Sequence, residues 1–193
     1  MIATLEGTLE HRGTDWAIIK VGGVGFQVHI SGSTLKKLGV IGDRVSLHTY
    51  LHLKEDNILL YGFTSGEELS LFKNLISVSG VGPKTALSLL SALDPEQLVM
   101  AIASGNIGII SQAPGVGKKV ASRLVLELKG KLEKEWGEVA LPLAVEDTDA
   151  VAALTSLGYS IREATQAISS LPDLTKLSLE EKVKLALQKL AER

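Results

Sequence analysis

The N-terminal part of the chain alternates β-branched or aromatic residues with polar ones, and short turn signals interrupt the alternation. Five segments fit β-strands, namely Ile2–Thr8, Trp16–Val21, Val24–Ile30, Arg44–His52 and Ile58–Phe63. Gly22-Gly23 supplies a two-residue hairpin turn, and Ser33–Leu38 has room for one or two helical turns. Five short strands and a small helix in residues 1–63 predict a small closed barrel, for which the oligonucleotide-binding (OB) fold is the usual architecture.

From residue 64 onward the apolar positions recur at helical spacing. Ser65 followed by Glu68 predicts a capping box at the start of one helix, and Pro83 suits the first turn of the next. Further helices are predicted to open at Asp94-Pro95, to cover Asn106–Ser111 and to run along Lys118–Lys131. The segment 64–132 therefore predicts two successive helix–hairpin–helix units.

Residues 133–149 break the helical pattern with many acidic side chains, small apolar residues, Gly137 and Pro142. This composition predicts a flexible acidic linker. Helical spacing then returns, with predicted helices at Ala150–Leu157, at Ile161–Leu171 after the candidate cap Ser160, and at Leu179–Ala191. Ser178 and Glu181 repeat the capping-box pattern. We expect a third domain of three helices, whose core is too thin to favour an enzyme.

Composition and charge narrow the function. The 193 residues include no cysteine, which excludes disulfides and thiolate metal sites and fits a reducing cytoplasm. The net charge is −2, but residues 63–132 carry seven Lys or Arg against five Asp or Glu, whereas residues 133–193 carry seven against eleven. The positive balance falls in the helix–hairpin–helix segment, where DNA binding would need it. Neither a signal peptide nor a transmembrane segment is predicted.

Two glycine-rich turns carry the candidate chemistry. The first is Gly80-Val81-Gly82-Pro83-Lys84, and the second is Pro114-Gly115-Val116-Gly117-Lys118-Lys119, which lies 35 residues further along. Glycines let the backbone approach a ligand closely, the following helix presents free N–H groups and the positive end of its dipole, and lysine adds a charge. One such turn is equally well a plain helix connection, but two matched copies favour repeated phosphates, as in a nucleic-acid backbone.

The predicted backbone-binding residues are Gly80, Gly82, Lys84, Gly115, Gly117, Lys118, Lys119 and Arg123. The alternative for the basic side chains is an ordinary solvated surface, but their place at the mouths of the turns favours phosphate contact. Neither turn is a nucleotide site, because Lys118-Lys119 lacks the hydroxyl of the phosphate-binding loop and the third glycine of the dinucleotide motif is absent. No cofactor is therefore expected.

Glu55 and Asp56 lie at the predicted hairpin tip between the last two strands. On composition alone they are an ordinary polar turn, whereas beside a DNA surface the same charges would repel phosphates. The four histidines, His11, His29, His48 and His52, all fall in the barrel segment and show no zinc-ligand spacing, so no metal site is predicted. No paired-carboxylate or Ser–His–Asp pattern indicates a catalytic site.

Taken together, these motifs resemble the RuvA family of bacterial Holliday-junction-binding proteins. The resemblance covers the whole chain and rests on Tyr50–Asp56, Leu60–Phe63, both glycine turns and the helix at Leu124–Lys129. It implies an OB-fold barrel in 1–63, a tandem helix–hairpin–helix domain in 64–132, a flexible acidic linker in 133–149 and a three-helix, UBA-like domain in 150–193.

The resemblance also implies a function. Members of the family bind four-way DNA junctions independently of sequence as a homotetramer, alone or as two stacked tetramers. Glu55 and Asp56 fall on the family's acidic pin at the junction centre, and the C-terminal domain is similar to the module that docks on RuvB, a hexameric ATPase. The chain would then be a non-catalytic subunit for branch migration in recombination, DNA repair and the SOS response. It would act in the bacterial cytoplasm at the nucleoid, with the RuvC resolvase as a further partner.

Two other functions stay open on the sequence alone. Some DNA glycosylases use a similar glycine turn with a nucleophilic lysine, but they also need a carboxylate soon afterwards, and no Asp lies between Asp94 and Asp147. A structural DNA-binding module, or the accessory subunit of a nuclease, would also fit the two turns. Strand cleavage at an abasic site distinguishes the first alternative, and equal binding to duplex and junction would favour the second.

Overall fold

The computed structural model describes residues 1–54, 57–137, 145–159, 161–171 and 177–191. The chain divides into two compact units. The first contains Met1–Pro95 together with Ser111–Val120, and the second contains Glu96–Ile110 together with Ala121–Arg193. The barrel and both glycine turns thus belong to the first unit.

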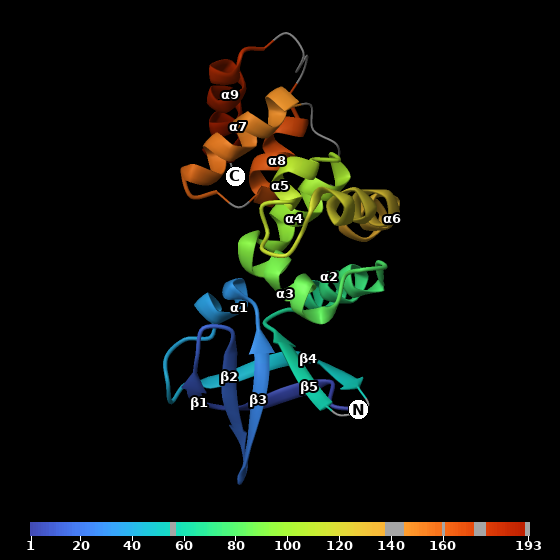
Figure 1. Ribbon diagram of the computed structural model, residues 1–193. Helices are drawn as coiled ribbons and strands as arrows, with labels where there is room; N and C mark the ends of the chain where they lie inside the picture. The colour runs from blue at the N-terminus through green and yellow to red at the C-terminus, as the bar shows by residue number, and fades with distance from the viewer. Residues whose placement is uncertain (55–56, 138–144, 160, 172–176, 192–193) are drawn as a thin grey trace. The chain divides into compact units, whose positions relative to one another are not determined.

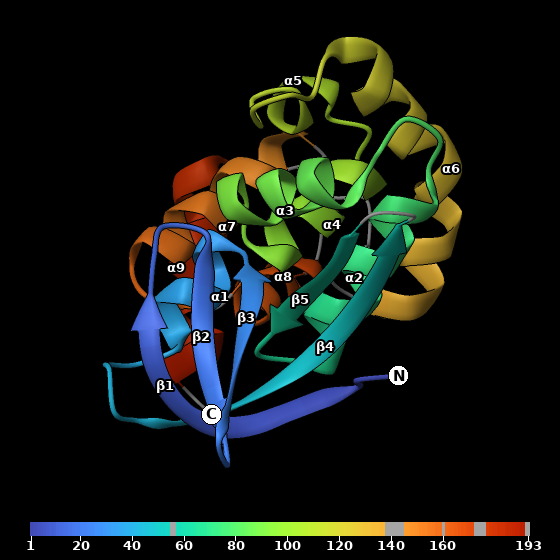
Figure 2. The same cartoon turned by 60° about the horizontal axis from the view of Figure 1, so that its bottom comes forward.

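Five strands of the first unit form a closed barrel (Figures 1 and 2). They are β1 (Thr4–Arg12), β2 (Trp16–Val21), β3 (Val24–Ile30), β4 (Arg44–Lys54) and β5 (Asn57–Phe63), in the order β1-β2-β3-β5-β4. The pair β3 and β5 is parallel and the other neighbours are antiparallel. Closure leaves no free sheet edge, and it confirms the five-stranded barrel expected from the alternating pattern.

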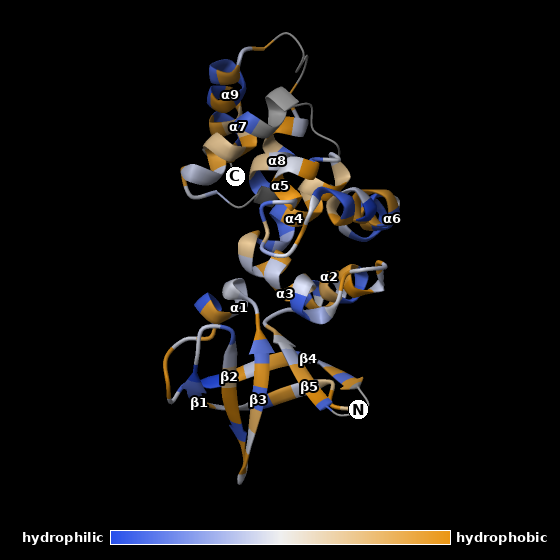
Figure 3. Ribbon diagram, viewed as in Figure 1, coloured by the Kyte–Doolittle hydropathy of each residue, from blue (hydrophilic) through white to orange (hydrophobic). Residues whose placement is uncertain are grey.

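The barrel core is built from the inward-facing side chains of the strands, including the fully buried Leu9, Ile19 and Val28. Figure 3 shows the apolar stretches along β3, β4 and β5. The first strand differs from the expected Ile2–Thr8, because its pairing with β2 continues to Arg12 opposite Ala17 after a shift in register. Backbone pairing thus extends the strand beyond the apolar pattern that marks it in the sequence.

Three helices of the first unit lie at one end of the barrel (Figures 1 and 2). They are α1 (Gly32–Lys37), α2 (Gly66–Ser77) and α3 (Pro83–Ala92). Ser31 caps α1 by accepting from the Thr34 N–H at 3.1 Å, and Pro83 occupies the first turn of α3 as expected.

The capping box expected at the start of α2 is only half formed. Ser65 accepts a hydrogen bond from the Glu68 N–H at 3.1 Å, which confirms the N-cap. The Glu68 carboxylate, however, does not turn back to Ser65 in this described part of the chain. It is buried among hydroxyl groups from the start of α1, because a buried carboxylate needs donors and α1 supplies them.

The remaining helices are α4 (Pro95–Ala103), α5 (Ile107–Ile110), α6 (Lys118–Trp136), α7 (Val145–Ser156), α8 (Ile161–Ser169) and α9 (Leu179–Ala191). Helix α6 is longer than the expected Lys118–Lys131, because the buried Leu132 extends its apolar stripe by one turn. Residues 133–136 belong to α6 and residues 145–149 to α7, whereas the sequence predicts an irregular linker there. Residues 138–144 lie outside the described residues. The domain boundaries themselves remain a prediction.

Helices α7, α8 and α9 share a small core that includes Val151, Leu154, Ala164 and Ile168. The capping box at the start of α9 is complete, unlike the one at α2. The Ser178 N–H donates to the Glu181 carboxylate at 2.9 Å, and the Glu181 N–H donates back to the Ser178 hydroxyl at 3.4 Å. The backbone and hydroxyl hydrogen bonds from Ser178 hold the pKa of Glu181 below its usual value. The predicted cap Ser160 lies outside the described residues.

Candidate nucleic-acid interface

The first glycine turn connects α2 to α3 and is anchored by two buried valines. Val78 is the C-cap of α2, and the Val81 N–H donates to the Val78 carbonyl at 3.0 Å. Gly80, between them, has φ +88°, a conformation that strains any residue with a side chain. Val78 and Val81 are buried while Gly80 and Gly82 are exposed, so the turn presents its glycine backbone to the outside.

The second turn repeats this geometry. The Val116 N–H donates to the Ala113 carbonyl at 3.0 Å, and Gly115 has φ +82°. Ala113 and Val116 are buried, while Gly115 and Gly117 are exposed. The spacing of 35 residues between the two turns also relates the helices that follow them. Equivalent positions in these helices are fully buried in both copies, namely Ala86 with Ala121 and Leu89 with Leu124. The two turns are therefore a structural repeat as well as a sequence repeat.

Neither the backbone conformation nor the packing of the protein requires glycine at positions 82 and 117. Gly82 has φ −86°, which any residue adopts, and Gly117 has no positive φ. A Cβ atom added at either position would meet no atom within 4 Å. The fold by itself would accept a side chain at both places, so the paired glycines favour the close approach of a ligand from outside.

Hydrogen-bond donors and positive charge surround the first turn. Gly82 is the N-cap of α3 and has no side chain to cap the first-turn N–H groups. An α-helix N-terminus left in this state favours an anion through its N–H groups and its dipole. Lys84 is exposed in the same helical turn and makes no hydrogen bond or ion pair with any residue that the structure describes.

The second turn carries more charge. Lys118 and Lys119 are both exposed in the first turn of α6. Arg123 follows Lys119 by four residues, on the same side of the helix, and is half-buried. All the predicted backbone-binding residues thus lie on the two turns or on the helices that begin there.

One hydrogen bond ties the two turns together. The Ser88 hydroxyl, on α3, donates to the Pro114 carbonyl of the second turn at 2.8 Å. Since α3 also begins at the first turn, one short helix sets the separation of the two turns. The sequence does not mark Ser88, because a serine inside a helix belongs to no motif and its partner is 26 residues away.

The predicted acidic pair, Glu55 and Asp56, falls between β4 and β5 in the sequence. Strands β4 and β5 are antiparallel, and their last described pair is Lys54 with Asn57. Glu55 and Asp56 lie outside the described residues, so their role stays a prediction.

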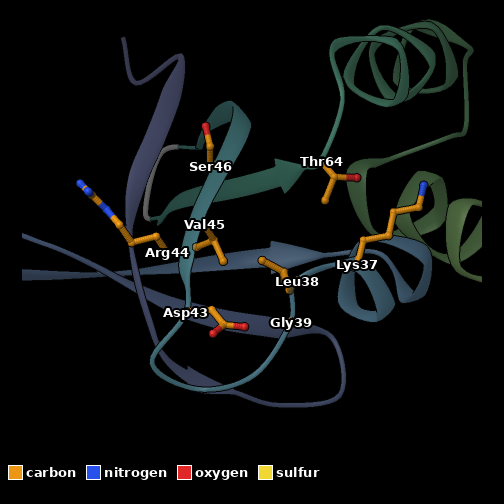
Figure 4. A pocket seen from close by; sticks show the side chains of 8 residues that line it. All are labelled: Lys37, Leu38, Gly39, Asp43, Arg44, Val45, Ser46 and Thr64. Carbon is orange, nitrogen blue, oxygen red and sulfur yellow. The ribbon is translucent and has the colours of Figure 1, made fainter.

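A surface cavity of about 430 Å³ beside β4 is a weaker candidate for an anion site. Its two basic side chains, Lys37 and Arg44, point away from each other (Figure 4). Arg44 lies 3.8 Å from the Glu6 carboxylate, and Asp43 accepts a hydrogen bond from the Val40 N–H at 2.9 Å. Because its polar groups do not converge, the cavity offers no defined ligand site.

Other site types receive no support from the described residues. No three His, Asp or Glu side chains in those ranges come together as metal ligands would. Within the same ranges, no single helix has the length and apolar composition of a membrane span. Helices α3 and α4 reach that length only when they are taken together, with a break between them.

The fold and the repeated turns define a class of proteins that join a small β-barrel to tandem helix–hairpin–helix units. Family models support this class: the RuvA N terminal domain matches residues 1–62, the SAM-like helix-hairpin-helix tandem matches 72–131, and the RuvA C-terminal domain matches 147–191. The chain belongs to the RuvA family.

Relatives similar over their whole length carry the description "Holliday junction branch migration complex subunit RuvA". The protein of Dehalococcoides mccartyi (strain CBDB1) is 50% identical over 188 residues, which cover 97% of each chain. That of Chloroflexus aggregans is 43% identical over 190 residues, again 97% of each chain. That of Pseudomonas entomophila is 40% identical over 201 residues, covering 97% of this chain and 98% of the relative. The family resemblance stated from the motifs is confirmed.

Proposed function

We propose that this chain is the DNA-binding subunit of a Holliday junction branch migration complex, in which it binds the four-way junction without reading its sequence. The observation that carries the proposal is the repeated glycine turn, with open space at Gly82 and Gly117 and basic residues directly after each turn. Family membership and the description of the relatives support the same role.

The two turns suit the DNA backbone. Each offers exposed backbone next to lysine, which binds phosphate oxygens and carries no information about bases. Two turns on one compact unit can hold two phosphate positions of one duplex arm. The resulting binding positions the DNA and depends steeply on salt, since each neutralised phosphate releases condensed counterions.

Junction selectivity requires several copies. Four arms related by rotation are matched by four identical subunits around a cyclic axis, so we assign the chain to a homotetramer, alone or as two stacked tetramers. In that arrangement Glu55 and Asp56, at the tip of the β4–β5 hairpin, form an acidic pin at the junction centre. Their charges repel phosphates and guide the strands from one arm to the next.

The motor lies on another protein. Neither glycine turn has the residues of a nucleotide-binding loop, so ATP hydrolysis belongs to a partner. The three-helix domain matched by the RuvA C-terminal model is assigned to docking on the RuvB ATPase, and the RuvC resolvase is a further partner of the assembled complex. The chain is then a non-catalytic subunit that acts in the bacterial cytoplasm, where its DNA substrate lies.

The decisive experiment compares affinities of the full-length protein for a four-way junction, a linear duplex of equal length and a single strand. The proposal expects clear preference for the junction and the same preference when the arm sequences are exchanged. Equal affinity for junction and duplex would contradict it and would favour a generic DNA-binding module. Cleavage of a duplex at an abasic site would instead support the glycosylase alternative. Light scattering with and without junction DNA counts the subunits.

A further inference from the structure

The Glu68 carboxylate is the most enclosed acidic group that the structure describes, with 1% of the residue exposed. It lies near the start of α2 and accepts hydrogen bonds from four hydroxyl groups: three come from the start of α1, and the fourth, at 3.4 Å, comes from Thr64 just before α2. Ser31 donates at 2.8 Å, Ser33 at 2.9 Å, and Thr34 at 3.1 Å and 3.0 Å to the two carboxylate oxygens. Ser31 is the N-cap of α1, Ser33 and Thr34 lie in its first turn, and α1 directly follows strand β3 of the barrel.

The same stretch of α1 is also bound to α3. The Gly32 N–H donates to the Ser91 hydroxyl at 2.9 Å, and the Ser33 hydroxyl lies 3.2 Å from the Leu90 carbonyl. Helix α1 is therefore hydrogen-bonded to both helices that flank the first glycine turn. Through Ser88, α3 also reaches the second turn. A continuous set of directional interactions thus runs from the barrel to both phosphate-binding turns.

A second connection between α2 and the barrel is apolar. The Phe72 ring lies 4.8 Å from Phe63, 5.3 Å from Tyr61 and 5.6 Å from Tyr50, measured between centroids. This packing holds α2 against the barrel alongside the hydrogen bonds to Glu68. The hydrogen bonds to Glu68 add preferred directions, since a carboxylate oxygen accepts best near the plane of the group.

We propose that Glu68 is a positioning residue that fixes the angle between the barrel and α3, and that this angle determines the preference for a four-way junction over a duplex. The inference rests on the proposed function. Binding of a duplex requires only the two turns, which lie together on the helical part of the first unit. Binding of a junction also requires the β4–β5 hairpin of the barrel at a defined place relative to those turns. The hydrogen bonds of Glu68 join α2, which leads to the first turn, to α1, which follows the barrel strand β3.

A set of matched variants tests the proposal. Glu68→Ala removes the acceptor, and Ser33→Ala with Thr34→Ala removes donors while keeping the carboxylate, in case the first variant folds poorly. Glu68→Gln keeps one acceptor oxygen and lets the hydroxyls reorient as acceptors, so it should restore much of the effect. Glu67→Ala is the control, because it removes the same charge from the exposed neighbouring position on the same helical turn.

We expect Glu68→Ala and the double variant to lower the ratio of junction to duplex affinity at least tenfold, with duplex affinity within about twofold of the parent. Glu67→Ala should leave the ratio unchanged, and Glu68→Gln should lie near the parent. Circular dichroism and thermal melting report whether each variant is folded. A folded Glu68→Ala or double variant with the parental ratio overturns the proposal. Equal loss of junction and duplex affinity also overturns it, because it indicates general damage.

A measurement without DNA separates this proposal from the proposed function. The chain has no cysteine, so Val24→Cys on the barrel and Ala92→Cys at the end of α3, both exposed, accept spin labels at those two sites alone. We expect one narrow distance distribution in the parent and a broader one with Glu68→Ala; identical distributions overturn the positioning role. A parent protein that lacks junction preference would overturn the proposed function instead, and the label distances would still decide whether Glu68 fixes the angle.

Discussion

Replacing Gly82 with alanine should weaken junction binding without changing stability. The new methyl group meets no atom within 4 Å in the protein, and φ −86° suits alanine. Alanine reduces the conformational entropy of the unfolded chain, which raises the free energy of unfolding by about 0.4–1 kcal/mol. Alanine is a poorer N-cap than glycine by about 0.5–1 kcal/mol. The two effects oppose each other, so the free energy of unfolding should stay within about 0.5 kcal/mol of the parent.

The effect on binding has no such compensation. The methyl group occupies the space where we place a phosphate, and a hydrogen bond to a charged group contributes about 1.5–3 kcal/mol. Affinity for a four-way junction should therefore fall about tenfold to a hundredfold for each phosphate hydrogen bond that the methyl group prevents. The slope of log affinity against log salt should become shallower by about 0.9 for each phosphate that is no longer neutralised. Gly117→Ala should behave in the same way, because its surroundings are equally open.

Urea unfolding and fluorescence titration of a labelled junction over a range of salt concentrations measure both quantities. Gly80→Ala serves as the contrasting variant, since at φ +88° it should cost about 1–2 kcal/mol of stability through backbone strain. Parental affinity and salt slope in a folded Gly82→Ala protein would refute the assignment of this open space to phosphate. A large loss of stability would refute the view that the fold itself does not need this glycine.

Three further predictions follow from the charged residues. Lys119→Ala should leave folding intact and reduce the salt slope of junction binding by about 0.9 for each phosphate that the complex no longer neutralises, and an unchanged slope would count against phosphate binding by this lysine. Glu55→Gln with Asp56→Asn should tighten junction binding yet disturb branch migration, measured by strand exchange with the RuvB motor; weaker binding with normal migration would remove the acidic pin. Glu181→Gln should lower the melting temperature at neutral pH, and the difference from the parent should shrink as the pH falls below the usual glutamate range and through the lowered pKa of folded Glu181, because the stabilising effect of the carboxylate disappears on protonation. A difference that persists in acid would contradict this reasoning.

Much of the architecture follows from local sequence patterns. Strand alternation marks the barrel, and the offset between the two glycine turns anticipates their matching backbone geometry. Interactions between residues far apart in the sequence cannot be predicted from such local patterns. The pattern Ser-x-x-Glu occurs at Ser65 and at Ser178, and it forms a complete capping box only at the second. At the first, the carboxylate is taken by hydroxyls more than 30 residues away, which no local pattern encodes.

The ends of helices are also hard to predict from local sequence patterns. The sequence pattern ends α6 at Lys131 because acidic residues follow, yet the buried Leu132 carries the helix on to Trp136. The backbone-binding residues proposed on the two turns could be named from the sequence because glycine and lysine have recognisable local roles. The hydrogen bonds of Ser88 and Glu68 could not be predicted, because they are made to partners that only the folded chain brings near.

The hydrogen bond from Ser88 to Pro114 has a consequence for the form of nucleic acid that the protein accepts. On the proposed function, two phosphate-binding turns held at a fixed separation select nucleic acids by the width of a groove. The minor groove of B-form DNA is narrow, whereas the minor groove of an A-form RNA–DNA hybrid is wide and shallow, and its phosphates are spaced differently. A hybrid duplex should therefore engage one turn at a time and forgo the gain in avidity that comes from two linked binding points.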